Sequence, residues 1–316
     1  MAKKYKLKKK VKRRIKLFLI LIVIVLGIYG ISIYKYHQTN EYKLLKIGYT
    51  SNETKKIEEK LTQKQIDSLL KEEKTDETII KLIKQKYFLN KYLDKYLDYM
   101  DENRVDDYKN IVSIVNAGGW RDPYKFTENA DITKGKAVLV NKYNLLTEDY
   151  NAGTIKTFSS EYAYGTVSAE EECYNAFIEM ADAAKEDGIT LLVTSGYRTY
   201  QHQEEVYQEM RNYQGKNYAD AYAARAGASE HETGLALDVF TYSATTDNFE
   251  KTDTYKWLIN NSYKYGFIRR YEEGKKSITG YSPESWHYRY LGKELAKKVY
   301  EEGITYDEYY AFYLDK

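Results

Sequence analysis

The sequence predicts an α+β protein with a mainly antiparallel sheet and flanking helices, preceded by a transmembrane helix and a helical stalk. Three observations predict this architecture. An apolar segment without charges lies near the N-terminus, a stretch rich in charged and apolar residues at helical spacing follows, and short strands then alternate with helices. We expect four parts: a basic tail (1–16), a membrane anchor (17–34), a helical stalk or packing region (35–125) and a C-terminal domain (126–316).

The N-terminal forty residues predict a membrane anchor. Lysine and arginine crowd residues 1–16, and residues 17–34 then read LFLILIVIVLGIYGISIY, without a charge. A helix needs about twenty apolar residues to cross a bilayer, so this run is close to sufficient. The residues after it show no cleavage pattern, which favours an uncleaved anchor over a removed signal peptide. The basic flank keeps the N-terminus in the cytoplasm, and everything after Tyr34 is then outside.

The basic tail also has a rival interpretation as a nucleic-acid-binding segment. The apolar run that follows directly disfavours it, because the tail would then lie beside the membrane. There its lysine and arginine side chains are better placed to contact anionic lipid. We therefore expect no nucleic-acid partner, and the formal net charge of the whole chain is only +2.

Residues 40–107 predict helices and offer no site chemistry. Apolar residues recur at helical spacing within 63–74 and 78–99, and the stretch contains neither proline nor tryptophan. This composition fits a stalk that spaces the C-terminal domain from the membrane. A Gly-Gly pair and a proline within 116–123 then mark a break.

The C-terminal domain is predicted to mix strands and helices. A capping box at Ser168–Glu171 should open a helix that Gly188 ends. The expected strands are 136–140, 189–195, 235–240, 267–270 and 286–291, and the other expected helices are 200–213, 255–265 and 293–302. The single cysteine, Cys173, excludes an internal disulfide and a cysteine-rich zinc site, and we expect it to be a small buried hydrophobe.

Two of the four histidines lie in motifs that contain carboxylates. His231 and Asp238 occur in the segment SEHETGLALD, and Glu284 and His287 occur in ESWH. Catalytic zinc uses three protein ligands and an open position, so His231, Asp238 and His287 can serve as the ligands. Glu284 is then free to take a proton from water. Two imidazoles and a carboxylate favour zinc over magnesium or calcium. The alternative is that both histidines are ordinary surface or core residues.

The local sequence also predicts how these side chains are presented. Gly234 argues against one continuous helix from His231 to Asp238 and permits a tight reversal, so His231 is expected at the end of a loop and Asp238 on the following strand. Pro283 disfavours a helix entering the second motif. We therefore expect Glu284 on a loop and His287 on a strand.

These motifs resemble the zinc D-alanyl-D-alanine carboxypeptidases of the VanY type. The resemblance rests on the pattern Ser-x-His-x-x-Gly-x-Ala-x-Asp followed by Glu-x-Trp-His, together with SGYR at 195–198, Gln203 and WHYRY at 286–290. It covers roughly residues 130–300. The superfamily also includes lysostaphin-like endopeptidases, L,D-carboxypeptidases and hedgehog-like domains.

The resemblance implies a role for each matching residue. His231, Asp238 and His287 would bind Zn²⁺, and Glu284 would be the catalytic base. Arg198 would face the substrate carbonyl or the developing oxyanion, where a cation stabilises negative charge; the alternative for Arg198 is a surface salt bridge. Within the same resemblance, Gln203 and Ser229 correspond to positions that hold the terminal D-alanine and the peptide backbone.

The function implied is a zinc-dependent carboxypeptidase that removes the C-terminal D-alanine from peptidoglycan stem peptides, with D,D-cleavage favoured. It would be held in the cell membrane by a single N-terminal span, with its catalytic domain extracellular. Three alternatives stay open: an L,D-carboxypeptidase acting on tetrapeptides, a peptidoglycan endopeptidase and a non-catalytic wall-binding protein. Glu284 favours an enzyme, because a binding module needs no general base beside its metal.

Overall fold

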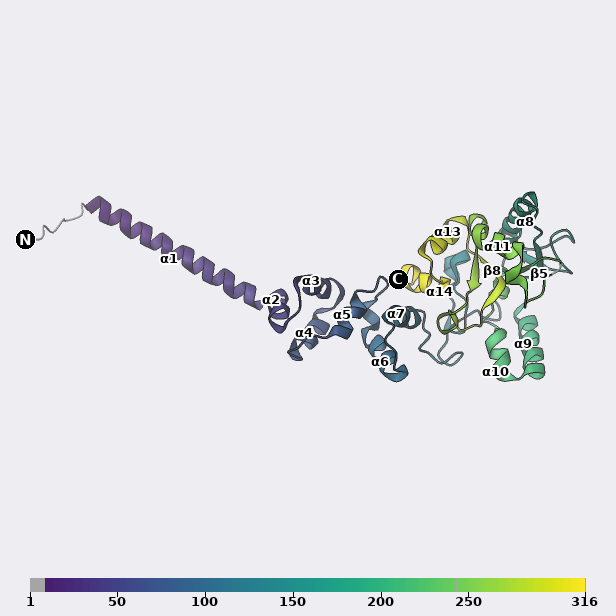
Figure 1. Cartoon of the computed structure of the whole chain (residues 1–316), viewed down its shortest axis with the longest axis horizontal. Coiled ribbons are helices and arrows are strands. Elements are labelled where there is room, and N and C mark those ends of the chain that lie inside the picture. Colours follow the sequence, from purple (N-terminus) through teal and green to yellow (C-terminus); the bar gives the residue numbers. More distant parts are fainter. Residues whose placement is uncertain (1–8, 243, 316) are drawn as a thin grey trace, which may run out of the picture. The chain divides into compact units, whose positions relative to one another are not determined.

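A computed structural model of the chain describes residues 9–242 and 244–315 (Figure 1). The chain divides between Lys91 and Tyr92 into two compact units. The sequence placed the start of the C-terminal domain near residue 126, so the second unit also contains helices that were grouped with the stalk. Residues 1–8 of the basic tail lie outside the described residues.

The first unit consists of helices. Its members are α1 (Lys9–Gln38), α2 (Asn40–Ile47), α3 (Ser51–Lys60), α4 (Gln63–Lys71) and α5 (Glu77–Ile83). Helix α1 is long and apolar enough to cross a membrane, with a mean hydropathy of 2.7 and no buried side chain. Thr50 and Thr62 form capping boxes that begin α3 and α4, which satisfies the first backbone N–H groups of both helices. The predicted helix over 78–99 is interrupted, because α5 ends at Ile83.

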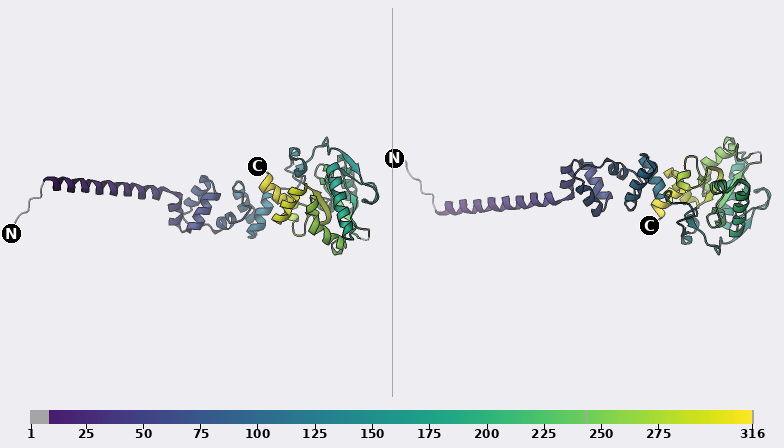
Figure 2. Two further views of the ribbon diagram at one scale, coloured as in Figure 1. Left: turned by 90° about the horizontal axis from the view of Figure 1, so that it is seen from above. Right: turned by 90° about the horizontal axis from the view of Figure 1, so that it is seen from below.

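The second unit is built around a four-stranded antiparallel sheet in the order β5-β6-β8-β7 (Figures 1 and 2). Its strands are β5 (Leu192–Ser195), β6 (Ala236–Phe240), β7 (Phe267–Tyr271) and β8 (Glu284–Tyr290). The helices are α6 (Leu93–Asn103), α7 (Tyr108–Asn116), α8 (Glu171–Glu186), α9 (Tyr200–Gln214), α10 (Lys216–Tyr222), α11 (Asp253–Asn261), α12 (Lys276–Thr279), α13 (Lys293–Glu302) and α14 (Tyr306–Tyr309). The predicted antiparallel sheet is therefore confirmed.

The two faces of this sheet differ in chemistry because successive residues of a strand point to opposite sides. Leu237, Phe267 and Tyr288 belong to an apolar core that also contains the buried side of α8 and part of α11. The residues next to them in sequence point the other way. That second face carries Asp238 and His287, and helices α13 and α14 cover part of it through a smaller core that includes Ile268 of β7. One face stabilises the sheet, and the other is available for polar groups.

Two short strand pairs complete the second unit. Strand β1 (Glu128–Asn129) runs parallel to β2 (Asn144–Leu145), and β3 (Ile155–Thr157) runs antiparallel to β4 (Ser168–Glu170). The predicted capping box at Ser168 is therefore wrong, because this serine lies in β4. Helix α8 begins one residue after Glu170, whose carboxylate accepts hydrogen bonds from the backbone N–H groups of Glu172 and Cys173.

The predicted strand at 136–140 is also wrong. Residues 136–137 end a 3₁₀ helix (Ile132–Ala137), and the next three residues have no regular structure. Buried side chains donate hydrogen bonds to the backbone carbonyl groups that a strand would offer to a neighbouring strand. Arg289 donates to the carbonyls of Lys136 (3.0 Å) and Val138 (2.9 Å), and the hydroxyl of Tyr306 donates to Ala137 (2.5 Å). Burial of this apolar run is thus achieved without a sheet partner.

Candidate active site

The pairing of β6 with β8 brings the two sequence motifs together. Asp238 and His287 are direct partners in this antiparallel register, so their side chains lie on the same face of the sheet. The distance from Oδ1 of Asp238 to Nδ1 of His287 is 3.1 Å. Two residues 49 positions apart in the sequence are therefore brought together as one cross-strand pair.

His231 reaches the same place from a short 3₁₀ turn, Glu230–Thr233, rather than from an open loop. Its Nε2 lies 3.5 Å from Oδ1 of Asp238, and its Nδ1 lies 2.8 Å from the carbonyl oxygen of Gly196. A carbonyl only accepts, so Nδ1 carries the proton and Nε2 presents a lone pair. Gly234 ends the turn at φ 70°, as predicted, and a Cβ there would lie 2.9 Å from the backbone nitrogen of Glu170.

The three side chains fit the donor set of zinc. The atoms they offer, from His231, Asp238 and His287, all lie within 4.8 Å of one another. Two ligands bound about 2.0–2.2 Å from a tetrahedral zinc are separated by about 3.4 Å. The two distances from Oδ1 of Asp238, 3.1 and 3.5 Å, bracket that value. Both histidines are buried.

Charges around these ligands shift their pKa values in opposite directions. Burial raises the pKa of Asp238, but His231 and His287 more than offset it and hold that pKa well below its usual range. Burial lowers the pKa of His287, yet its bonds to Asp238 and Glu230 raise it to about 9. Burial and the cation of Arg198 lower the pKa of His231. A cation between these groups therefore meets a carboxylate that stays ionised.

Glu284 lies beside the ligands but is the first residue of β8, not part of a loop as the sequence suggested. The strand extends this far because Glu284 pairs with Tyr271 of β7 across an irregularity in the register. Its Oε2 is 3.8 Å from Nδ1 of His287. Burial, opposed by the charge of His287 and assisted by that of Asp238, raises the pKa of Glu284 to about 7. A carboxyl group with this pKa can both accept and release a proton near neutral pH.

Arg198 follows β5 and points toward the same ligands. Its Nη2 lies 4.0 Å from Oδ2 of Asp238 and donates to the hydroxyl of Ser195 at 2.5 Å, while Nη1 donates to Oε1 of Gln203 at 3.1 Å. Gln203 is buried on α9 and also donates to the carbonyl of Ala224 (2.7 Å). Gln203 thus fixes the direction of the guanidinium group.

Ser229 is buried at the start of the turn that carries His231. The carboxylate of Glu232 holds this segment by accepting from the backbone N–H groups of Gly227 (2.8 Å) and Ser229 (3.3 Å). Burial raises the pKa of Glu232 to about 7, against the effect of these two bonds. These hydrogen bonds therefore connect the loop before His231 to the 3₁₀ turn that contains it.

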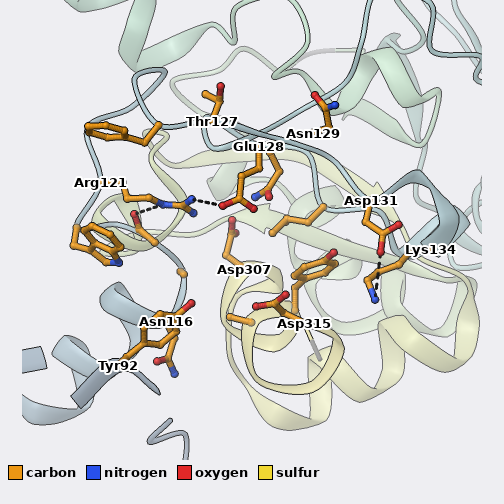
Figure 3. A pocket seen from close by; sticks show the side chains of 18 residues that line it. Tyr92, Asn116, Arg121, Thr127, Glu128, Asn129, Asp131, Lys134, Asp307 and Asp315 are labelled. Atoms are coloured by element: carbon orange, nitrogen blue, oxygen red, sulfur yellow. Dashed lines mark hydrogen bonds and ion pairs between the residues drawn. The ribbon is translucent and has the colours of Figure 1, made fainter. Parts of the chain in front are cut away.

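All seven residues predicted for the site line one cavity of about 170 Å³. A separate cavity of about 760 Å³ lies elsewhere in the second unit (Figure 3). None of the seven predicted site residues, which all belong to the described part of the chain, lines this second cavity. There the charged side chains pair with one another: Arg121 is 3.9 Å from Glu128, and Lys134 is 3.7 Å from Asp131. The smaller cavity holds the candidate chemistry.

Four residues next to the candidate ligands were not predicted: Glu230, Arg270, Arg289 and Asp307. Their side chains form a buried ionic cluster that touches His287 through Glu230. Arg270 and Arg289 are buried residues with aromatic neighbours in the strands FIRRY and ESWHYRY. An arginine at an inward position of a strand is a usable signal of a buried carboxylate partner. Glu230 and Asp307 carry no comparable signal.

Comparison with known sequences agrees with this site. The family model described as VanY, D-alanyl-D-alanine carboxypeptidase, matches residues 166–293. A D-alanyl-D-alanine carboxypeptidase of Enterococcus faecalis is 36% identical over 193 residues, covering 58% of this chain and 68% of that protein. The putative carboxypeptidase YodJ of Bacillus subtilis is 36% identical over 182 residues, covering 54% and 66%. The chain thus spans about two thirds of the length of both relatives.

A similar fold occurs in a solved structure, the LD-carboxypeptidase LdcB. It is 34% identical, with a TM-score of 0.55, and the match covers 59% of this chain and 90% of that one. The family match and the identity across more than two thirds of the E. faecalis protein show that this chain belongs to the VanY family of D-alanyl-D-alanine carboxypeptidases.

Proposed function

We propose that this protein is a zinc-dependent carboxypeptidase that removes the C-terminal D-alanine from peptidoglycan stem peptides. The observation that carries the proposal is the convergence, in one small cavity, of three zinc-ligand atoms, a carboxyl group with a raised pKa and a guanidinium group. Membership of the VanY family supports the same reaction class.

His231, Asp238 and His287 would hold the metal through Nε2, Oδ1 and Nδ1, the atoms that face one another. When bound, zinc polarises the scissile carbonyl and lowers the pKa of a water molecule. Asp238 supplies the negative charge that offsets part of the metal's positive charge. The two buried imidazoles supply neutral donors in fixed orientations.

Glu284 is the proposed proton carrier. Its carboxylate accepts the proton of the attacking water and then gives it to the amine of the departing D-alanine. The raised pKa, about 7, suits both steps, because neither protonation state is strongly favoured at neutral pH. Burial of this group also limits competing exchange with bulk solvent.

Arg198 is proposed to bind the oxygen that gains negative charge as the tetrahedral intermediate forms. Fixed donors aimed at a developing oxyanion stabilise the transition state more than the ground state. The hydrogen bonds from Arg198 to Ser195 and Gln203 fix the guanidinium before substrate arrives. We assign Gln203 to substrate binding through this support of Arg198 and through its place in the cavity wall.

The cavity is suited to a small terminal residue. A volume of about 170 Å³ is below the range of about 300–1,000 Å³ typical of sites for drug-sized ligands. Ser229 offers a hydroxyl group in its wall, and Trp286 offers an aromatic surface. These features favour a single D-alanine beyond the scissile bond, with Ser229 contacting the peptide.

D,D-cleavage of a pentapeptide is our first choice, because the E. faecalis relative is named a D-alanyl-D-alanine carboxypeptidase. L,D-cleavage of a tetrapeptide is the second, because the fold also matches an LD-carboxypeptidase. We propose that α1 spans the cell membrane once, with the N-terminus in the cytoplasm and the second unit facing the wall.

The experiment that tests this function gives the detergent-solubilised full chain three substrates: stem pentapeptide, stem tetrapeptide and cross-linked dimer. We expect D-alanine release from the pentapeptide, sensitive to chelator and restored by zinc. Faster release from the tetrapeptide would make the protein an L,D-carboxypeptidase. Cleavage of the dimer alone would make it an endopeptidase, and cleavage of none of the three would overturn the proposal.

A further inference from the structure

Glu230 contacts His287, one of the three proposed zinc ligands. Its side chain has no solvent exposure, and its Oε2 lies 3.3 Å from Nε2 of His287. Nε2 is the ring nitrogen that does not face Asp238 or His231. The carboxylate of Glu230 therefore meets His287 at the ring nitrogen that Asp238 does not contact, and Glu230 also lines the cavity.

The other oxygen of Glu230 is held by two guanidinium groups. Oε1 accepts from Nε of Arg270 at 2.8 Å and from Nη1 of Arg289 at 2.9 Å. Arg289 is further fixed by donating to the carbonyls of Lys136 and Val138. Arginine has only donors, so the atom in the Oε1 position must be an acceptor. The carboxylate plane is therefore set by groups that do not belong to the metal site.

The cluster is balanced in charge. Asp307 pairs with Nη1 of Arg270, so two carboxylates balance two guanidinium groups, and all four side chains have no solvent exposure. Asn141 donates to the other oxygen of Asp307 at 2.9 Å. Removing one member of a buried ion pair is costly, because the partner is left charged without solvent. Neutrality therefore keeps Glu230 ionised and in place.

We propose that Glu230 is a positioning residue for the metal site: its Oε2 holds the proton on Nε2 of His287, which leaves the lone pair on Nδ1 for zinc. This inference rests on the proposed zinc site. An ionised carboxylate only accepts hydrogen bonds, so the histidine must donate to it through Nε2. Carboxylates that fix the tautomer of a ligand histidine are a general feature of metal sites, and losing one costs about 10–100-fold in metal affinity.

The two histidines of the site are thereby prepared in opposite ways. The carbonyl of Gly196 holds the proton of His231 on Nδ1 and frees Nε2. Glu230 holds the proton of His287 on Nε2 and frees Nδ1. Both free nitrogens face Oδ1 of Asp238, at 3.5 and 3.1 Å. His231 keeps its tautomer when metal binds, and His287 keeps the proton on Nε2 and loses only the one that it shares with Asp238.

Glu230→Gln tests this directly, because the cluster dictates how the amide must turn. The two guanidinium groups require the amide oxygen at the Oε1 position, so the amide nitrogen occupies the Oε2 position. That nitrogen donates to Nε2 of His287 and moves the ring proton to Nδ1, the metal-facing atom. We expect zinc affinity, measured by competition with a chromophoric chelator, to fall about 10–100-fold.

Asp307→Asn is the matched control. It removes the same single negative charge from the same buried cluster, but the side chain of Asp307 bonds to Arg270 and Asn141 rather than to His287. We expect it to lower the unfolding temperature about as much as Glu230→Gln does and to leave zinc affinity within a few fold of wild type. Equal losses of zinc affinity in both variants would overturn the inference, since charge imbalance alone would then explain them.

A second readout reports the tautomer without metal. The chain has only four histidines, so selective ¹⁵N labelling of histidine gives a simple spectrum. In the metal-free full chain, at a pH where His287 is neutral, we expect its proton on Nε2 in wild type and on Nδ1 in Glu230→Gln. A proton on Nδ1 in wild type would overturn the inference, even if the variant does not fold. Wild type that binds no zinc would instead overturn the proposed metal site and leave this readout intact.

Discussion

Asp238 and His287 face each other across β6 and β8, with Oδ1 of Asp238 3.1 Å from Nδ1 of His287 and 3.5 Å from Nε2 of His231. One carboxylate oxygen therefore lies between two imidazole nitrogens. In the absence of metal, this oxygen is the acceptor for His287, whose pKa is raised to about 9. A bound metal ion would take the place of the proton between Nδ1 of His287 and Oδ1 of Asp238, and it would carry a higher positive charge.

Asp238→Asn should abolish useful zinc binding. The amide keeps the size of the side chain but loses the charge that neutralises part of the metal's positive charge. We expect the dissociation constant for zinc to rise by about 100-fold or more, which exceeds the loss expected for a residue next to the ligands. Asp253→Asn, at an exposed position on α11, is the control and should bind zinc as wild type does. Unchanged binding in Asp238→Asn would exclude this residue as a ligand.

The stability of the metal-free protein should depend on pH through Glu284. Its pKa is raised from 4.5 to about 7 by burial, so the folded state binds this proton more tightly than the unfolded state does. The contribution to stability is fully present below about pH 4.5 and is lost as pH rises through about 7. At pH 8 the ionised group costs about 3 kcal/mol.

Glu284→Gln removes this titration and provides the test. In chelator, the variant should match wild type near pH 5 and be more stable by up to about 3 kcal/mol at pH 8. All three tryptophans, 120, 257 and 286, lie in the second unit, so tryptophan fluorescence during denaturant unfolding reports on that unit. A stability difference that does not change between pH 5 and pH 8 would contradict the raised pKa.

Gly196→Ala should damage both stability and metal binding. A Cβ at this position would lie 2.2 Å from the carbonyl oxygen of Ser168, so the backbone must move. The displaced carbonyl of Gly196 is the one that holds His231. We expect a loss of about 1–3 kcal/mol and a fall in zinc affinity of about tenfold.

Gly119→Ala is its control. A Cβ there would meet the carbonyl oxygen of Ser277, also at 2.2 Å, but Gly119 does not line the candidate site. It should lose similar stability and retain zinc affinity. If both variants bind zinc equally well, the contact from Gly196 to His231 has no part in preparing the site.

The sequence predicted those parts of the fold in which local pattern and tertiary packing agree. Strand β6 coincides with a run of mainly apolar residues, and one face of this strand is buried in the core. Helix α13 spans Lys293–Glu302 as predicted. The candidate ligands could be proposed from the sequence because zinc chemistry restricts them to few residue types and the chain has only four histidines. These chemical restrictions depend on residue type alone, so they can be recognised in the sequence without knowing which residues are neighbours in the fold.

The errors arose where distant residues decide the local structure. Residues 136–138 read as a strand, but their carbonyl groups are taken by Arg289 and Tyr306, more than 150 positions away. Glu284 joins a strand only because Tyr271 is there to pair with it. Glu230 could not be assigned a role, because its partners come from β7 and β8. No pattern within the segment itself contains this information.

The orientation of the chain across the membrane can be tested with a single introduced cysteine. Cys173 is fully buried, and burial raises the pKa of its thiol well above the usual value, so it should not react. Tyr213→Cys lies at a position that is 90% exposed on α9. We expect an impermeant maleimide to label Tyr213→Cys in intact cells and to label Lys9→Cys only after lysis. The reverse pattern would invert the proposed topology.

The central claim is that Glu284 and a zinc ion act together to release D-alanine. The most direct measurement compares D-alanine release from stem pentapeptide by the full-length wild type and by Glu284→Gln, both loaded with one zinc per chain. We predict zinc-dependent release by wild type and a loss of about 100-fold or more in the variant, since a general base contributes about 10²–10⁴ in rate. Equal rates from the two zinc-loaded proteins would contradict the account.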